Sequence, residues 1–134
     1  MSDSRPIPPD DWADPRHRLG LAGEELAILH FRDAGWRVEA HRFRVGRNEL
    51  DLVVRRGALV AFVEVKTRQG QAFGRGREAI GWRKRQALGR VAEVWRLRHG
   101  RAGDLYRFDV VEIDCRRTGG PQLVHIEDAW RLSR

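Results

Sequence analysis

The stretch NELDLVVRRGALVAFVEVKTR, which runs from Asn48 to Arg68, decides the fold of this chain. Its alternation of apolar with other residues predicts two β-strands, and the Arg-Gly pair between them predicts a tight turn. Charged residues interrupt the apolar pattern of both strands: Glu49, Asp51, Glu64 and Lys66. The stretch therefore raises the question of why a sheet core would hold three carboxylates and an ammonium group.

The second strand, predicted from Ala58 to Arg68, begins with two apolar faces and ends with one charged face. Side chains alternate across a strand, so Glu64 and Lys66 share the face of Val60 and Phe62. Two apolar faces are typical of a central strand that is covered on both sides. A carboxylate at the end of such a strand is costly unless it is paired or binds a metal.

The first strand, predicted from Asn48 to Arg55, places Glu49 and Asp51 on one face. The other face is apolar and consists of Leu50, Leu52 and Val54. The hairpin turn brings Asp51 beside the following strand, so we expect its carboxylate to converge with that of Glu64.

Two converging carboxylates beside a lysine have a specific chemical use. Hard oxygen ligands bind Mg²⁺ or Mn²⁺, and such a metal polarises a phosphoryl group and lowers the pKa of a bound water. Lys66, one of only two lysines among 26 basic residues, would orient that water or stabilise charge on the phosphate. The alternative that the sequence leaves open is a salt bridge of Lys66 with Glu64 or Asp51, without chemistry.

The rest of the chain completes an α/β pattern. The further predicted elements are the helices Pro15–Ala34 and Glu78–Arg98 and the strands Trp36–Val45, Leu105–Ile113 and Gln122–Ile126. Three strands with short connections predict an antiparallel meander, and the long second helix allows a crossover to a parallel strand. The order α-β-β-β-α-β-β therefore predicts a mixed central sheet of about five strands flanked by helices.

Length and charge set the class of protein. The 134 residues predict a single domain over 15–134, behind a flexible arm over 1–14 that is rich in Pro, Asp and Ser. No apolar run approaches the ~20 residues that span a bilayer, so we expect no membrane segment and a cytoplasmic location. The net charge of +7 favours nucleic acid as a partner. The sequence leaves open whether the chain forms a homodimer.

Cations gather near the start of the second predicted helix. Lys84 lies in its apolar stripe, and Arg75, Arg77 and Arg83 precede it. Because a helix N-terminus adds positive potential, this cluster suits a phosphate backbone. The alternative is a lysine whose apolar stem is buried while its amine reaches solvent.

Helical spacing predicts a place for one further acid, and side-chain size predicts places for three tryptophans. Glu24 lies on the apolar stripe of the first helix, where the alternative is an acid satisfied by an Arg or a backbone donor. Trp36, Trp82 and Trp95 are expected to pack in the core or against helices rather than to stack on bases.

In this order, the segments GLAGEELAILHFRDAGW, NELDLVV, VAFVEVKTR, WRKRQAL and RFDVVEI resemble the YraN-like family of small bacterial proteins. The resemblance extends over roughly Arg16 to Asp128. It implies a restriction-endonuclease-like core of the PD-(D/E)xK superfamily, similar to archaeal Holliday junction resolvases. It also implies a metal-dependent nuclease.

The resemblance assigns roles to particular residues. Glu24 matches the acid of the first helix, and Asp51 matches the aspartate of the D motif. Glu64 and Lys66 match the acid and the lysine of the E-x-K motif. The implied metal ligands are thus Asp51 and Glu64, helped by Glu24.

Other positions of the family pattern are matched or altered. Glu49 and Lys84 match further recurrent polar positions. Asn48 stands where the family usually has Gly, and Arg42 stands where Asn is common. These departures leave the implied ligands intact, but they bear on the local backbone and on a substrate contact near Arg42 and Arg44.

The implied activity is a Mg²⁺- or Mn²⁺-dependent cleavage of DNA, with branched or structured DNA as one form of the substrate. The rival interpretation is a non-catalytic nucleic-acid-binding or assembly module that keeps the nuclease fold. RNA is the third interpretation of the partner. The intact set of Asp51, Glu64 and Lys66 favours the enzyme, because a decayed site would be expected to lose one of these residues.

Overall fold

One five-stranded sheet organises the computed structural model, which describes residues 15–68, 80–114 and 119–132. The elements are α1 (Pro15–Asp33), β1 (Arg37–Val45), β2 (Asn48–Arg56), β3 (Leu59–Arg68), α2 (Trp82–His99), β4 (Leu105–Asp114) and β5 (Gln122–Trp130). The strands lie side by side in the order of the chain. Strands β1, β2 and β3 pair antiparallel, β4 pairs parallel to β3, and β5 pairs antiparallel to β4. The predicted α/β fold and element order are confirmed.

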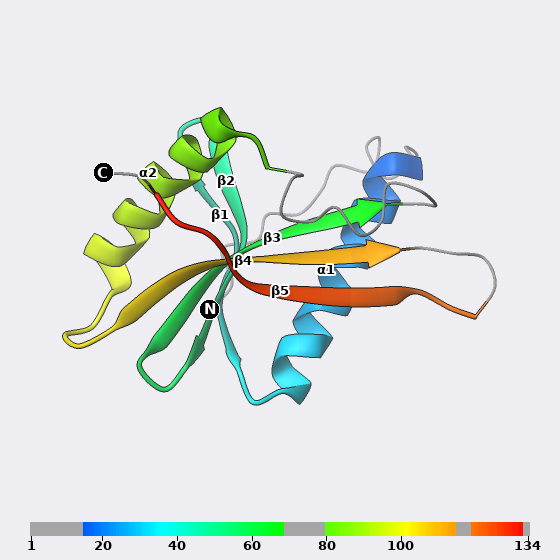
Figure 1. The fold of residues 1–134 in the computed structure, drawn as a ribbon, viewed down its shortest axis with the longest axis horizontal. Coiled ribbons are helices and arrows are strands. Elements are labelled where there is room, and N and C mark those ends of the chain that lie inside the picture. The colour runs from blue at the N-terminus through cyan, green and yellow to red at the C-terminus, as the bar shows by residue number, and fades with distance from the viewer. Residues whose placement is uncertain (1–14, 69–79, 115–118, 133–134) are drawn as a thin grey trace.

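The two helices cover opposite faces of the sheet (Figure 1). Strand β3 lies at the centre and contributes to both cores, as its two apolar faces predicted. Val60 and Phe62 pack on the α2 side, and Ala61 and Val63 pack on the α1 side. Glu64 and Lys66 therefore extend the face that α2 covers.

Strand β2 departs from the predicted alternation. Leu52 and Val54 pack on the α1 side, but Leu50 belongs to the α2-side core together with Phe43, its partner on β1. The prediction that these three β2 residues share a face is wrong for Leu50. The irregularity coincides with Arg42 on β1, which has a left-handed backbone with φ of 59°. A left-handed residue in a strand interrupts the alternation of faces, while the register of β1 with β2 stays constant from Ala40 to Val45.

Two element boundaries also differ from the prediction. Helix α2 begins at Trp82 rather than at Glu78, because Gly81 is extended, with φ of −69° and ψ of 165°. Strand β5 continues past Ile126 to Trp130. Asp128 has φ of 49° within a register shift, and this local bulge allows the strand to resume its pairing with β4.

Not all of the tryptophans pack in the core or against helices, as their size led us to expect. Trp36 and Trp95 are buried, at 5% and 2% exposure, as expected for core residues. Trp82 is 70% exposed at the first position of α2, so the prediction of a packed side chain is wrong there.

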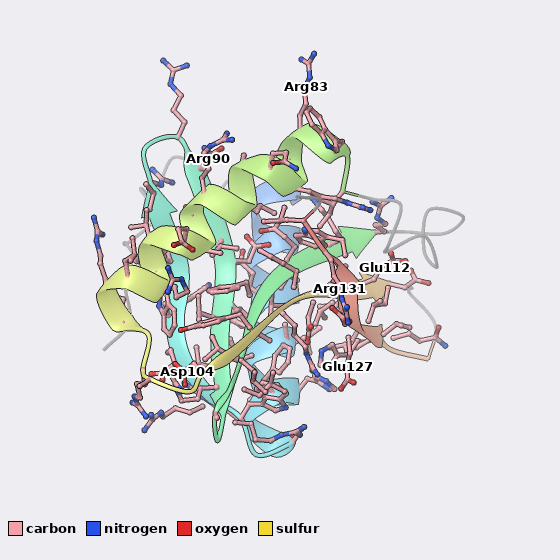
Figure 2. The ribbon with its side chains drawn as sticks, turned by 60° about the vertical axis from the view of Figure 1, so that its left-hand side comes forward. Arg83, Arg90, Asp104, Glu112, Glu127 and Arg131 are labelled. Carbon is pink, nitrogen blue, oxygen red and sulfur yellow. The ribbon has the colours of Figure 1, made fainter. Side chains whose placement is uncertain are left out.

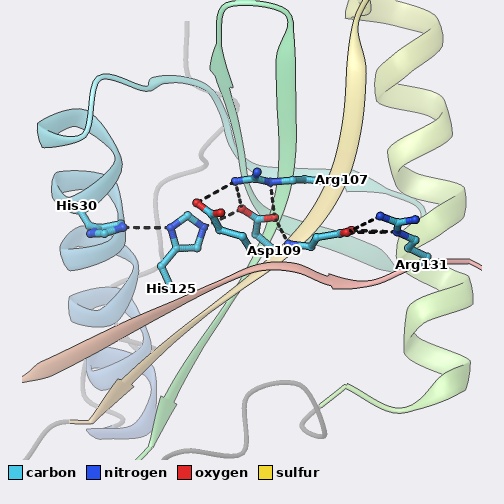
Figure 3. A network of polar contacts seen from close by, with 7 residues as sticks. His30, Arg107, Asp109, His125 and Arg131 are labelled. Carbon is cyan, nitrogen blue, oxygen red and sulfur yellow. Dashed lines mark hydrogen bonds and ion pairs between the residues drawn. The ribbon is translucent and has the colours of Figure 1, made fainter.

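A polar network connects α1 with β4 and β5 on the α1 side of the sheet (Figure 3). His30 Nε2 lies 3.2 Å from His125 Nδ1, and His125 Nε2 lies 2.7 Å from Asp109 Oδ2. Arg107 donates to both oxygens of Asp109, over 2.9 and 3.1 Å. Asp109 is fully buried, and these partners satisfy its charge.

Two parts of the predictions lie outside the described residues: the arm over 1–14 and the positions of Arg75 and Arg77. Neither of the helices in the described part of the chain is apolar enough over a sufficient length to traverse a lipid bilayer.

Candidate functional site

Asp51 lies where β2 and β3 separate. Their pairing extends from the turn, where Gly57 has φ of 62°, as far as Leu52 and Val63. One residue further along β2, the carboxylate of Asp51 accepts a hydrogen bond from the backbone N–H of Val65, over 2.7 Å. The hairpin therefore brings Asp51 against β3, as its turn predicted, and the side chain replaces a strand-to-strand hydrogen bond.

Glu64 lies on β3, next to Val65, and is buried beneath the first turns of α2. Its side chain is 3% exposed, and its Oε2 lies 3.5 Å from Lys84 Nζ, whose side chain is 50% exposed. Within the described part of the chain, Glu64 Oε1 is buried and has no hydrogen-bond partner. The ion pair that the sequence suggested for Lys66 is thus made by the other lysine of the chain.

The environment of Asp51 and Glu64 disfavours their charged forms. Burial, together with the negative charge of Glu64, holds the pKa of Asp51 well above its usual range. Burial also raises the pKa of Glu64, although the ammonium groups of Lys84 and Lys66 act in the opposite direction. Two carboxylates in this condition gain from any cation that reaches both.

Lys66 is partly buried on the same face of β3. Burial, and then the positive charge of Lys84, lower the pKa of its ammonium group, while Glu64 and Asp51 raise it. Its charged form is therefore less favoured than that of a lysine in water. Such a group releases a proton more easily than an exposed lysine.

Glu24 on α1 lies within electrostatic reach of Asp51, but its carboxylate is already occupied. Arg42 donates from Nε and Nη2 to its two oxygens, over 3.0 and 2.9 Å, and His41 Nε2 lies 2.8 Å from Oε1. Burial alone would raise the pKa of Glu24, but the hydrogen bonds from His41 and Arg42 hold it below its usual value. An arginine satisfies this acid, as one of the two interpretations of the sequence expected.

A cleft of about 420 Å³ opens beside Asp51. It is lined by Arg47, Asn48, Glu49, Asp51, Arg83, Lys84, Ala87 and Leu88. Figure 2 shows Arg83 extending outward from the first turn of α2. Most of the residues predicted from β2 and α2 thus face one space. Arg47 also lines the cleft and was not predicted. Its position in the short β1–β2 connection, next to the strand that carries Glu49 and Asp51, could have indicated it.

Arg44 and Glu49 are cross-strand partners on β1 and β2. Arg44 donates to Glu49 Oε2 from Nε and Nη2, over 3.2 and 2.8 Å, and remains 55% exposed. Glu49 lines the cleft, whereas Arg44 lies at its outer side, held by this ion pair.

Strand β4 adds an acid that the sequence analysis did not identify. Glu112 is the register partner of Lys66 in the parallel pair and is 1% exposed. It shares the α2-side face with Val110. Only the parallel register makes these two residues neighbours. The signal in the sequence was the charged end of the apolar run VVEID, which repeats the pattern of VEVK.

The carboxylates of Asp51 and Glu64 fit a divalent metal ion. Their hard oxygens suit Mg²⁺ or Mn²⁺, and Mg²⁺ often uses only one or two carboxylates and keeps several waters. The buried, unpartnered Oε1 of Glu64 is the atom that such an ion would satisfy. Among the described residues, no three His, Cys, Asp or Glu side chains form a metal-binding group, and Glu24 is engaged by Arg42.

Comparison with known proteins gives a consistent result. A model described as "Uncharacterised protein family UPF0102" matches residues 23–113. The chain is 39% identical over 112 residues to a UPF0102 protein of Nocardia farcinica, and the match covers 84% of this chain and 88% of that protein. It is 38% identical over 95 residues to one of Alkaliphilus metalliredigens, covering 71% and 83%. It is 36% identical over 111 residues to one of Desulfitobacterium hafniense, covering 82% and 92%.

Proposed function

The chain belongs to the UPF0102 family, which is the YraN-like family, and on that premise we propose that it is a Mg²⁺- or Mn²⁺-dependent endonuclease acting on DNA, including branched or structured DNA. One observation carries the proposal. Asp51, Glu64, Lys66 and Lys84 lie within electrostatic reach of one another, and Asp51 and Lys84 line a cleft that is bordered by the cations Arg47 and Arg83.

The roles of the residues follow from their surroundings. Held by Asp51 and Glu64, the metal would polarise the scissile phosphate and lower the pKa of the attacking water. Lys66, whose pKa is lowered by burial, would orient that water and exchange a proton with it. Glu24 would contribute by holding Arg42 and His41, or through a water molecule, because its own oxygens are occupied.

Phosphate binding is assigned to the start of α2. Its first turn contains no acidic residue and carries Arg83 and Lys84. The positive end of a helix and two cations suit a DNA backbone. Lys84 Nζ lies 3.5 Å from Glu64 Oε2 with its side chain half exposed, so its amine would be able to contact a phosphate if Glu64 held a metal ion instead. A cytoplasmic location fits a protein that meets DNA or RNA.

The test is a cleavage assay on linear, flapped and four-way DNA with Mg²⁺ or Mn²⁺ and a chelator control. We expect Asp51→Ala and Lys66→Ala each to lose about 100-fold in rate, the usual order for removing an electrostatic or acid–base group. Glu25→Ala, an exposed acid on α1, is the matched control and should retain activity. Cleavage that survives both site substitutions would overturn the assignment.

A non-catalytic binding module is the second candidate, and the pairing of Glu24 favours it. A carboxylate held by Arg42 and His41 gives the site a fixed internal cation in place of a third ligand. This candidate predicts salt-dependent DNA binding without cleavage in either metal. A crystal soaked in Mn²⁺ separates the two, because the enzyme requires an ion between Asp51 and Glu64.

A further inference from the structure

Trp82 has a surface position that the fold itself does not explain. Its side chain is 70% exposed, whereas Trp36, Trp95 and Trp130, the other tryptophans of the described residues, are 5%, 2% and 5% exposed. Single exposed apolar residues are common on proteins, so exposure alone decides nothing. The neighbours of this ring and their charges distinguish it from an ordinary surface residue.

Trp82 is followed directly by two cations of the candidate cleft. Arg83 and Lys84 line that cleft with Arg47 and Asp51. Trp82 itself does not line the cleft, but it is the first residue of α2 and precedes Arg83 by only ~1.5 Å along the helix axis. A phosphate on these cations would place its attached nucleoside within reach of the indole.

An exposed aromatic ring beside phosphate-binding cations is the arrangement that holds single-stranded DNA. Every base has a flat face that stacks on an aromatic side chain, and the cations hold the backbone. Bases inside a duplex already stack on each other, so an unpaired base is the one available to a protein ring. Leu97 is similarly exposed, at 71%, but it lies near the opposite end of α2 from Arg83 and Lys84 and has no aromatic ring to stack.

We propose that Trp82 stacks on an unpaired base of the DNA whose phosphate is held by Arg83 and Lys84. This inference rests on the proposed function and narrows its substrate to DNA with an unpaired nucleotide next to the bound phosphate. It assigns to Trp82 a role in substrate selection and no part in the chemical step.

The test compares a duplex that carries one unpaired base with the same duplex fully paired. Binding is followed by fluorescence anisotropy, with Ca²⁺ replacing Mg²⁺ or Mn²⁺ so that affinity is measured without cleavage. Trp82→Ala should weaken binding of the bulged DNA about tenfold, the order expected for one stacked base, and of the paired duplex less than twofold. Trp82→Phe should keep most of the difference. Leu97→Ala is the control for loss of an exposed apolar side chain on the same helix.

A second readout reports stacking directly. With 2-aminopurine as the unpaired base, the unaltered protein should quench its fluorescence, and Trp82→Ala should not. Equal weakening of both DNAs by Trp82→Ala, or no weakening of either, would overturn the inference. A different outcome would overturn the proposed function alone. In that case the unaltered chain would prefer the bulged DNA in a Trp82-dependent way but would cut no DNA with any metal. Failure to bind either DNA would overturn both.

Discussion

Arg42 combines an unusual backbone conformation with a partly buried charge. Its φ of 59° lies in the left-handed region, which residues other than Gly, Asn and Asp rarely adopt. The guanidinium group holds both oxygens of Glu24, and it also lies within the electrostatic reach of Glu49 and Asp51. A cation that belongs to the chain thus stabilises the acids around the candidate metal site.

Replacing Arg42 with Asn should therefore strengthen metal binding. Asn tolerates a left-handed backbone but carries no charge, so Glu24 is freed and a repulsive cation is lost. We expect the dissociation constant for Mn²⁺, measured by calorimetry, to fall about tenfold, which corresponds to about 1.4 kcal/mol. Without metal, the melting temperature should fall, because the buried Glu24 carboxylate loses its arginine partner and keeps only His41.

Arg44→Asn is the matched control for this substitution. It makes the same change on the same strand, but Arg44 pairs with Glu49 on the exposed side. It should leave the affinity for Mn²⁺ within about twofold, since exposed ion pairs contribute about 0–1 kcal/mol. An unchanged affinity in Arg42→Asn would show that Glu24 neither reaches the metal nor senses it.

At the scale of elements, α1 approaches β3 closely at one position. A Cβ atom added at Gly23 would lie 2.1 Å from Thr67 Oγ1 and 3.4 Å from Thr67 Cβ. Contacts under 3 Å are not tolerated, so a larger residue would displace the helix or the threonine. This close approach positions Glu24, the next residue of α1, against the sheet.

Whether Gly23→Ala lowers or raises the free energy of unfolding should depend on the side chain at position 67. In the natural background we expect a net loss of about 1–2 kcal/mol in the free energy of unfolding, because overpacking exceeds the gain in helix propensity. In a Thr67→Ala background, which removes the clash, the same substitution should stabilise by up to about 1 kcal/mol. Urea unfolding of the four proteins of this double-mutant cycle measures the coupling. Additive effects would contradict the close approach.

Local sequence accounts for most of the elements but not for all of their ends. The turn at Gly57 and the alternation in β3 depend on residues that are near in the chain, and both were predicted. The start of α2 and the continuation of β5 were not. Gly81 has an extended backbone immediately before the helix, and β5 continues past the bulge at Asp128 because β4 offers a partner for Trp130.

At the scale of the molecule, the candidate site destabilises the metal-free fold. Glu64 is buried and Asp51 is partly buried close to it, and the pKa of each is raised. A carboxyl whose folded pKa lies above its unfolded value stabilises the fold only in its protonated form. That contribution is present below the unfolded pKa and is lost as the pH rises through the folded pKa.

Asp51→Asn should therefore make the metal-free protein more stable at pH 7. Asn keeps the oxygen that accepts from Val65 and removes the charge, and we expect a gain of about 0.5–2 kcal/mol in the free energy of unfolding. The gain should shrink as the pH falls, because protonation relieves the natural protein as well. Chemical denaturation between pH 7 and pH 4 measures this difference.

Divalent metal should reverse the order of the two proteins. Saturating Mn²⁺ stabilises only the protein that binds it. The melting temperature of the natural protein should therefore rise, and that of Asp51→Asn should stay unchanged. A destabilised Asp51→Asn protein at pH 7 without metal would show that the charge of Asp51 is compensated in the fold.

The sequence by itself determined the strands, the hairpin turn and the shared face of Glu64 and Lys66. These depend on periods of two and of 3.6 residues and on turn chemistry, which act between neighbours in the chain. The tertiary structure decided which groups meet. It paired Lys84 rather than Lys66 with Glu64 and gave Glu24 to Arg42. Such contacts depend on strand register and on helix docking, which join residues far apart in sequence and leave no local pattern.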